Sequence, residues 1–294
     1  MTGANSGLGF ETARALAAAG AEVVLACRSE KNAQEASDKI HEHLKEAKLR
    51  PLELDLDSLE SVRAAANKFL SFNLPLHFLI LNAGIMATPN AKTKDGFERQ
   101  LGVNHLSHFL LTELLLPKVK ESAPSRVITL SSRGHYLYAP KEGFRWDDLA
   151  ANRGYDRWER YGQSKLANIL HMEELQRRLD AEGVKDVICV SVYPGAVYST
   201  GLFRQKPPLT SILPHLFTFI RMGLTAKYKT IEQGSSTTVY CALSPDVVKG
   251  EYYADCGVER DGYRHGQVSN QATAKRLWEE SVKLVGLGTP EGRS

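Results

Sequence analysis

The sequence has few cysteines, no long apolar run and little excess of charge. Its 294 residues include only Cys27, Cys189, Cys241 and Cys256, and no two of them form a CxxC pair. Isolated thiols of this kind are usually reduced and buried, which argues against a disulfide framework. The 37 basic and 34 acidic side chains leave a net charge of +3, and no block of like charge marks a nucleic-acid or anionic-membrane surface.

The longest apolar stretch outside the strand-like runs is LTSILPHLFTFIRMGL, which Pro214, His215 and Arg221 interrupt. It is too short to cross a membrane and is typical of an amphipathic lid or surface helix. The remaining composition, 43% hydrophobic and 24% charged, is that of a soluble globular protein. The sequence leaves two locations open for the protein: the cytoplasm, or a membrane surface that faces the cytosol.

Short apolar runs alternate along the chain with longer segments of helical spacing. The runs predict buried strands at 21–27, 49–55, 76–82, 126–131 and 187–194. The longer segments predict helices at 29–47, 58–70 and 93–120. Strands that are apolar on both faces, each followed by a helix, indicate a parallel sheet covered on both sides. We therefore expect an α/β fold, a doubly wound parallel sheet (Rossmann fold), as a single domain over 1–294 with a substrate-lid insertion at 200–230.

The sequence begins MTGANSGLGF, in which Gly3, Gly7 and Gly9 precede a helix that runs to about Ala19 and stops at Gly20. Glycine permits a positive φ and lets a pyrophosphate approach the backbone. The first N–H groups of the following helix, and its positive dipole end, attract that phosphate. The spacing alone also occurs in ordinary tight turns, so its meaning depends on the rest of the chain.

The strand after this helix ends in Ala26, Cys27 and Arg28. Dinucleotide-binding folds place an acidic residue near this point to bind the ribose hydroxyls, and NADP-binding versions place an arginine there. Cys27 stands in the acidic position, and the planar fork of the Arg28 guanidinium can pair with two oxygens of a 2′-phosphate. The sequence therefore favours NADP(H), and the alternative is a solvated arginine at a strand end.

Tyr161 and Lys165, in RYGQSKLAN, are four residues apart and would share one face of a helix. Lowering a tyrosine pKa from about 10 to near neutrality requires roughly 4 kcal/mol of preferential stabilisation of the phenolate. An ammonium about 4 Å away supplies a similar amount at an effective dielectric constant near 20. We therefore expect Lys165 to lower the pKa of Tyr161, helped by the positive charge of an oxidised nicotinamide. A surface pair is the alternative for this spacing taken alone.

These motifs together resemble the short-chain dehydrogenase/reductase family over nearly the whole chain. The family's TGxxxGxG matches Thr2 to Gly9, its NAG matches Asn82 to Gly84, and its YxxxK matches Tyr161 and Lys165. The catalytic residues that the resemblance implies are Tyr161, Lys165, Ser132 and Asn104. The cofactor-binding residues that it implies are Gly3, Asn5, Ser6, Gly7, Leu8, Gly9, Arg28, Asp55, Leu56, Asn82, Ala83, Gly84, Tyr161, Lys165, Pro194, Gly195 and Ser199.

The family also implies a role for most of these residues. Asp55 corresponds to the residue that contacts the adenine amino group, and Asn104 to the asparagine that holds a water for proton relay. Ser132 corresponds to the serine that polarises the substrate oxygen, with Ser131 as the neighbouring alternative. Pro194 begins the loop beside the nicotinamide.

Within the family, the sequence is most similar to the branch of retinol dehydrogenases and WW-domain-containing oxidoreductases. That branch implies NADP(H) and carbonyls or alcohols of retinoid, steroid or lipid-aldehyde type. Asn82 stands where protochlorophyllide reductases usually have cysteine, which argues against that relative. Ser199, followed by Thr200, replaces the usual threonine of the nicotinamide loop. The long segment 133–160 is expected to wall the substrate pocket, with a surface excursion as the alternative.

A glycine-rich turn of this kind normally follows a buried strand, yet only Met1 precedes Thr2. In a sheet of order 3-2-1-4-5-6 that strand is central, and Met1 stands where its last residue belongs. Four buried aliphatic side chains would contribute roughly 6–12 kcal/mol, against a total stability of about 5–15 kcal/mol. We therefore expect the central first strand to be missing, the true product to start upstream, and the chain as written to fold poorly or bind cofactor weakly.

The function that the sequence predicts is hydride transfer between NADP(H) and a carbonyl or alcohol, with Tyr161 as general acid/base. The alternative is a non-catalytic dinucleotide-binding or scaffold protein, because of the short N-terminus. No metal is expected: His105 and His108 are three residues apart, lack a third ligand, and are interpreted as core or subunit-interface histidines. The sequence leaves open whether the protein forms a homodimer. It also leaves open whether a missing N-terminal segment attaches the protein to a membrane.

Overall fold

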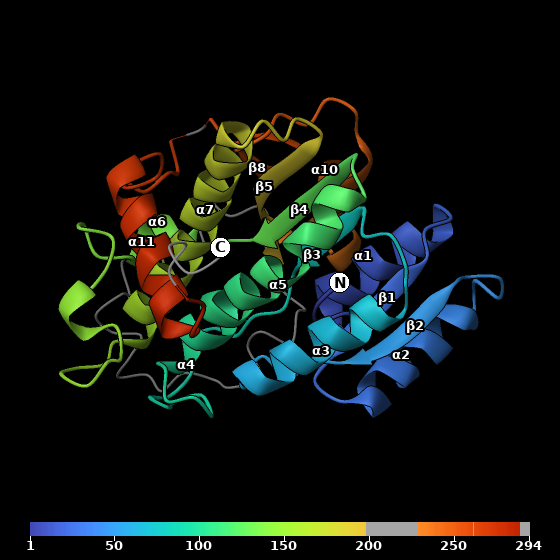
Figure 1. Ribbon diagram of the computed structural model, residues 1–294, viewed down its shortest axis with the longest axis horizontal. Coiled ribbons are helices and arrows are strands. Elements are labelled where there is room, and N and C mark those ends of the chain that lie inside the picture. The colour runs from blue at the N-terminus through green and yellow to red at the C-terminus, as the bar shows by residue number, and fades with distance from the viewer. Residues whose placement is uncertain (198–227, 261, 289–294) are drawn as a thin grey trace.

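The computed structural model describes residues 1–197, 228–260 and 262–288. Two groups of strands form its centre (Figure 1). A parallel pair contains β1 (Val23–Cys27) and β2 (Leu49–Glu53). A larger sheet has the order β3 (Phe78–Leu81), β4 (Ser125–Leu130), β5 (Val187–Tyr193), β8 (Tyr252–Ala254) and β9 (Gly257–Val258). Its pairs are parallel except for the β8–β9 hairpin, and a separate short pair joins β6 (Ala196–Val197) to β7 (Tyr228–Lys229).

Helices cover both faces of the strands. The longer ones are α1 (Gly7–Ala18), α2 (Glu30–His41), α3 (Leu59–Ser71), α5 (Ser107–Glu121), α7 (Arg157–Ala181), α10 (Ile231–Leu243) and α11 (Gln271–Leu284). The shorter ones are α4 (Arg99–Leu101), a π-helical turn at Gly102–Leu106, α6 (Gly134–Tyr138) and a 3-10 turn at Trp146–Asp148. Polar N-caps begin several of them: the side chains of Ser29, Ser58 and Asp156 each accept a hydrogen bond from a backbone N–H of the first turn.

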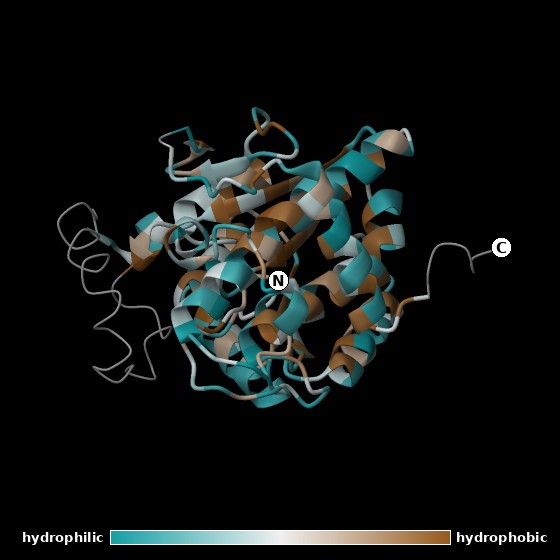
Figure 2. Cartoon of the chain, turned by 90° about the vertical axis from the view of Figure 1, so that its left-hand side faces the viewer, coloured by the Kyte–Doolittle hydropathy of each residue, from teal (hydrophilic) through white to brown (hydrophobic). Residues whose placement is uncertain are grey.

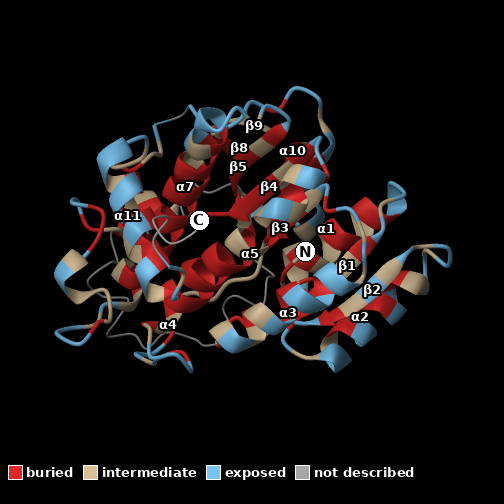
Figure 3. Ribbon diagram, in the orientation of Figure 1, coloured by how far each residue is buried: buried red, intermediate tan, exposed pale blue. Residues whose placement is uncertain are grey.

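The sheet separates the two larger hydrophobic clusters of the described residues. On one face, α1, α2 and α10 pack over β1 and the middle of the larger sheet, around side chains such as Leu25 and Ile128. On the other face, α3, α5, α7 and α11 form the larger cluster around Phe109 and Leu170. Apolar residues gather on the inward sides of the helices (Figure 2), and the inner turns of α5 and α7 are buried (Figure 3). This is the doubly wound arrangement that the sequence predicts.

The first three residues lie between β1 and β3. The Met1 carbonyl accepts a 2.9 Å hydrogen bond from the Ala26 N–H, and the Gly3 N–H donates to the Ala26 carbonyl at 2.8 Å. On the other side, the Thr2 N–H donates to the Ile80 carbonyl at 3.0 Å. Among the described residues this short segment is the link that hydrogen-bonds β1 to β3, and it occupies the centre of the strand order. Met1 to Gly3 are thus hydrogen-bonded to β1 on one side and to β3 on the other.

The predicted strands all form: four are slightly shorter than their apolar runs, and β4 is shifted by one residue toward the N-terminus. The sequence predicts a buried strand at 49–55, but in β2 only Leu52 is buried. The predicted helix at 93–120 is only partly right: Lys92 and Glu98 form an antiparallel bridge, and the helix begins at Arg99. The insertion predicted at 200–230 falls almost wholly outside the described residues. Cys27, Cys189, Cys241 and Cys256 are all free thiols. Of the helices described, none has the length and apolarity that a membrane span requires.

Candidate active site

The candidate residues gather at one edge of the sheet because they follow the ends of parallel strands. Arg28 follows β1, Asp55 follows β2, Asn82 follows β3, Ser132 follows β4 and Pro194 follows β5. The carboxyl ends of parallel strands meet at a single edge, which is where doubly wound folds bind their ligands. Residues that lie far apart in the sequence are thereby brought to the same side of the molecule.

The glycine-rich turn has the backbone conformation that its glycines predict. Gly3 has a φ of +65° and Gly7 a φ of +54°, both in the region that disfavours side chains. Gly9 lies inside α1, where a Cβ would lie only 2.1 Å from the Gly3 carbonyl oxygen. Ser6 is the N-cap of α1 and its side chain caps no N–H group, so the first N–H groups of the helix are left for another acceptor. Asn5 and Leu8 lie in the same turn and first helical turn.

Asn82 and Thr2 hold the turn against the loop after β3. The Asn82 Nδ2 donates to the Thr2 carbonyl at 2.9 Å and to the Gly3 carbonyl at 3.3 Å. In return, the Thr2 hydroxyl oxygen accepts from the backbone N–H groups of Asn82 and Ala83, both at 3.0 Å. A Cβ on Gly3 would come within 3.0 Å of Ala83. The Asn82 side chain thus supports the turn by hydrogen bonds to its backbone.

The residues predicted to recognise the adenosine half lie after β1 and β2. Arg28 is exposed, whereas Cys27 is buried with its pKa raised to about 11 by burial. Asp55 is paired with Lys94 at 2.9 Å, and this hydrogen bond, with that from the Asp57 N–H, outweighs burial and lowers its pKa. The Leu56 side chain is buried in the core, so it offers no side-chain contact at this edge.

Ser132 and Tyr161 are brought together by β4 and α7. A Cβ on Gly134 would lie 2.7 Å from the Tyr161 ring and 3.4 Å from the Ser132 Oγ, so the two side chains are close, and Tyr161 is only 3% exposed. The Ser132 hydroxyl lowers the pKa of Tyr161 against the larger effect of burial. The neighbouring Ser131 points elsewhere: its hydroxyl donates to the Lys165 carbonyl at 2.7 Å. The geometry therefore favours Ser132 over Ser131 as the partner of the tyrosine hydroxyl.

Lys165 lies one helical turn after Tyr161 and is also buried. Its Nζ lies 5.9 Å from the centroid of the tyrosine ring and donates to the Leu130 carbonyl at 3.1 Å. Burial lowers the pKa of Lys165 to about 8 and raises the pKa of Tyr161 to about 12. The expected lowering of the Tyr161 pKa by Lys165 is therefore not found, because the cost of burying a phenolate is the largest effect. A tyrosine that keeps its proton at neutral pH is able to donate it to an oxygen.

Asn104 lies in the π-helical turn and is fully buried. Its Nδ2 donates to the Ile85 carbonyl and to the Ser164 hydroxyl, both at 2.9 Å, and its Oδ1 accepts from the Ile85 N–H at 2.8 Å. A Cβ on Gly84 would lie 3.3 Å from both the Asn104 Oδ1 and the Lys165 Nζ. Asn104 thus fixes the end of the loop that Asn82 begins, close to the lysine.

Part of segment 133–160 packs directly against the tyrosine. Tyr138 and Trp158 are buried with Tyr161 in a small cluster, their rings 5.3 Å apart. Two glycines allow this approach: a Cβ on Gly134 would lie 2.7 Å from the Tyr161 ring, and one on Gly162 would lie 2.4 Å from the Ala139 nitrogen. Residues near both ends of segment 133–160 therefore pack around Tyr161.

The loop after β5 completes this edge. Gly195, after Pro194, has a φ of +96°, and a Cβ there would lie 2.6 Å from the Lys229 side chain. Lys229 in turn pairs with Asp255. Ser199 and Thr200, predicted to reach a nicotinamide amide, lie outside the described residues.

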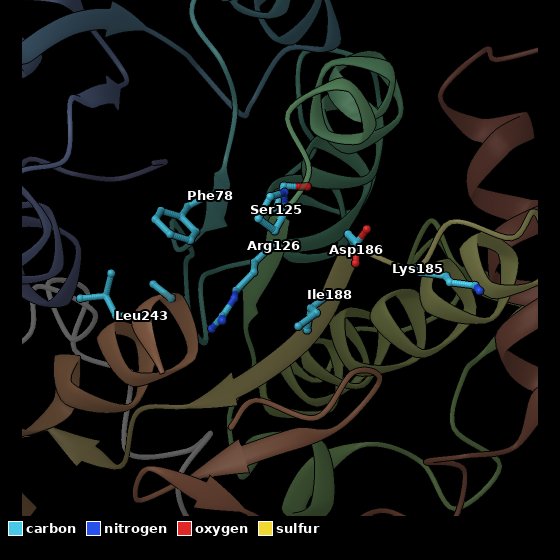
Figure 4. A pocket seen from close by; sticks show the side chains of 9 residues that line it. Phe78, Ser125, Arg126, Lys185, Asp186, Ile188 and Leu243 are labelled. Carbon is cyan, nitrogen blue, oxygen red and sulfur yellow. The ribbon is translucent and has the colours of Figure 1, made fainter. Parts of the chain in front are cut away.

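A separate pocket of about 310 Å³ lies at the opposite edge of the sheet (Figure 4). It is lined by Phe78 and Ser125 at the amino ends of β3 and β4, by Asp186 just before β5, and by Leu243 at the end of α10. It contains none of the candidate residues. Since ligands of doubly wound folds bind at the carboxyl edge, this pocket is not the predicted site.

His105 and His108 are both buried in the core, and the described residues contain no group of three or more potential ligands for a metal.

Some contacts that shape the site were not predicted from the sequence. The roles of Thr2 and His108 as hydrogen-bonding partners had no separate signal in the sequence. Gly162 did carry one, because a glycine in the interior of a helix costs about 1 kcal/mol and often marks a close approach.

Comparison with known proteins agrees with this geometry. The profile of the family described as short chain dehydrogenase matches residues 1–141. Retinol dehydrogenase 12 of Mus musculus is 40% identical over 289 residues, which cover 98% of this chain and 85% of that protein. The chain therefore belongs to the short-chain dehydrogenase/reductase family of oxidoreductases.

Within that family it lies in the retinol dehydrogenase branch. Retinol dehydrogenase 11 of Homo sapiens is 41% identical over 98% of this chain and 85% of its own length. The chloroplastic short-chain dehydrogenase TIC 32 A of Brassica napus is 40% identical over 97% of this chain and 87% of its own length. A solved structure of an uncharacterised protein from Mycobacterium paratuberculosis has a TM-score of 0.72 and 34% identity, covering 98% of this chain and 93% of that one.

Proposed function

We propose that the protein is an NADP(H)-dependent oxidoreductase that interconverts a carbonyl and an alcohol. The observation that carries the proposal is the buried Tyr161, close to Ser132 and with Lys165 one turn away. A protonated phenol beside a hydroxyl is suited to bind a carbonyl oxygen and to give it a proton. The relatives named as retinol dehydrogenases support a retinoid, and steroids and lipid aldehydes complete the substrate class that we propose.

The residues at the carboxyl edge fit a dinucleotide. Gly3 and Gly7 have positive φ, and the absence of a side chain on Gly9 lets α1 approach the turn, which suits a pyrophosphate at the helix N-terminus. Arg28 is exposed at the end of β1, where a 2′-phosphate would pair with its guanidinium. Bound there, NADPH would supply the hydride for reduction.

The protein's own residues would then control the proton and the orientation of the substrate. Ser132 donates a hydrogen bond to the substrate oxygen, and Tyr161 transfers its proton to that oxygen as negative charge develops. Lys165, charged below about pH 8, stabilises the phenolate that is left and binds ribose hydroxyls. Asn104 holds the loop of Gly84 beside Lys165 and anchors the water through which the proton is replaced.

The test is Tyr161→Phe, which removes the proton donor and keeps the ring. Positioned proton transfer contributes about 10²–10⁴ in rate, so kcat should fall by that factor with NADPH binding retained. Tyr138→Phe is the matched control, since Tyr138 lies in the same cluster and the proposed mechanism assigns it no proton transfer. NADPH oxidation is followed over a panel of carbonyl compounds. If Tyr161→Phe were as active as Tyr138→Phe, Tyr161 would not be the proton donor. The non-catalytic alternative would instead show no NADPH oxidation by the wild type.

Arg28→Glu tests the cofactor. It replaces the guanidinium with a carboxylate, which would repel the negatively charged 2′-phosphate. The substitution should therefore weaken NADPH binding much more than NADH binding. Titration of both nucleotides by fluorescence provides the two dissociation constants. Equal losses for NADPH and NADH would contradict the preference for NADP(H).

A further inference from the structure

His108 joins the two ends of the loop that faces the candidate site. This loop, residues 82–85, is held at its start by Thr2 and at its end by Asn104. One ring nitrogen of His108, Nε2, lies 3.0 Å from the Thr2 hydroxyl. The other, Nδ1, lies 3.1 Å from the Asn104 carbonyl oxygen. A single imidazole thus touches both residues that clamp the loop.

The direction of each hydrogen bond follows from what its partners can do. The Thr2 oxygen already accepts two N–H groups, from Asn82 and Ala83, which uses both of its lone pairs. Its hydroxyl hydrogen is therefore donated to the His108 Nε2, which must be unprotonated. The Asn104 carbonyl can only accept, so His108 Nδ1 must carry a hydrogen. Both ends require the same neutral tautomer, with the proton on Nδ1.

The surroundings keep the ring in that state. His108 is 1% exposed, and burial, together with the nearby charge of Lys165, lowers its pKa to about 4. Protonation of Nε2 would remove the acceptor that the Thr2 hydroxyl needs. The π-helical turn before α5 places the Asn104 carbonyl where the ring four residues later can reach it.

We propose that His108 is a positioning residue, fixed as the Nδ1–H tautomer, that couples the Thr2 clamp on Asn82 and Ala83 to the Asn104 clamp on Ile85. It touches neither substrate nor cofactor. Through Thr2 it sets the start of the loop against the glycine-rich turn. Through Asn104 it sets the end of the loop beside Lys165. The inference rests on the proposed function for its kinetic consequences, but the tautomer and the loop contacts do not.

Two substitutions separate the ends of this connection. Asn at position 108 places its amide nitrogen near the position of Nδ1, so His108→Asn keeps the donor to Asn104 and loses the acceptor for Thr2. Gln reaches the position of Nε2, so His108→Gln keeps an acceptor for Thr2 and loses the donor to Asn104. Loss of one buried hydrogen bond corresponds to roughly a tenfold effect. We expect His108→Asn to raise KM for NADPH about tenfold with kcat nearly unchanged, and His108→Gln to lower kcat about tenfold with that KM nearly unchanged.

The experiment combines these kinetics with NMR of ¹⁵N-histidine-labelled full-length protein, in which the two variants assign the His108 signals. The expected spectrum shows a neutral Nδ1–H ring between pH 6 and about 8. An Nε2–H or charged ring would overturn the proposal. So would variants that both keep the wild-type kcat and KM, or that lose both parameters in parallel with thermal stability, as a purely structural role predicts. If the wild type turns over no carbonyl, the proposed function fails, and the NMR result still decides the tautomer.

Discussion

Replacing Gly9 by alanine would place a methyl group 2.1 Å from the Gly3 carbonyl oxygen and 2.5 Å from the Asn82 Nδ2. The Gly3 oxygen belongs to the backbone and cannot move aside as the end of a flexible side chain could, whereas the Asn82 amide is a side-chain end. Either the first turn of α1 moves away from Gly3, or the Asn82 amide gives up its hydrogen bonds to the turn. Both responses disturb the part of the molecule that is proposed to bind pyrophosphate.

The size of the effect is the balance of two terms. Alanine is favoured over glycine inside a helix by about 1 kcal/mol. Forcing a methyl group into a filled space typically costs about 1–3 kcal/mol, and contacts as short as these belong at the upper end. The net loss in the free energy of unfolding should therefore be about 1–2 kcal/mol. The same misplacement of the helix N-terminus should weaken NADPH binding by roughly tenfold or more.

Thermal unfolding and fluorescence titration with NADPH measure the two effects. The matched control is Gly20→Ala at the other end of α1, where φ is +91° and nothing lies within 4 Å of the new methyl group. That substitution costs about 1–2 kcal/mol of backbone strain without touching the turn. It should lower stability and leave NADPH affinity unchanged. If Gly9→Ala bound NADPH as tightly as the wild type, the steric reasoning about the turn would be refuted.

Two further predictions concern α7. Gly162→Ala would place a methyl group 2.4 Å from the Ala139 nitrogen, so it should push α6 away from α7 and reduce kcat at least tenfold. Steady-state kinetics measure this, and a variant with the wild-type kcat would contradict it. Glu173 accepts hydrogen bonds from Ser269, and burial raises its pKa to about 7 from an ordinary 4.5. Because the folded pKa is the higher one, folding favours the protonated form, and the free energy of unfolding should fall as pH rises from about 4.5 through 7. Glu173→Gln should flatten that slope in urea denaturation at pH 5 and 8, and an unchanged slope would show that another group is responsible.

The parts of the fold that depend on local pattern could be predicted from the sequence. Every apolar run that indicated a strand forms one. β1, β3, β4 and β5 are also largely buried, because a strand covered on both faces must be apolar on both. β2 is the exception, with only Leu52 buried. The pairing of Ser132 with Tyr161 follows from the motif order, since a strand end and a helix must meet at the carboxyl edge. The choice between Ser131 and Ser132 needed the structure, because it depends on which way each side chain points after β4.

What the sequence could not supply is the balance of long-range interactions. The raised pKa of Tyr161 results from burial by Tyr138 and Trp158, which the charge of Lys165 alone does not indicate. The pairing of Asp55 with Lys94 joins segments that are 39 residues apart. The break in the predicted helix at 93–120 arises from a bridge between Lys92 and Glu98 that helical periodicity cannot show.

The π-helical turn at Gly102–Leu106 has a consequence for how this site tolerates changes in length. A π-helical turn closes over five residues, as the bond from Ser107 to Gly102 shows, so it holds one residue more than an α-helical turn. Each residue of an α-helix turns the chain by about 100°. Removing one residue would let a regular helix form and rotate everything before it, Asn104 included, by about that angle relative to His108. The alignment of Asn104 with its loop thus depends on the number of residues in one helix as much as on their identity.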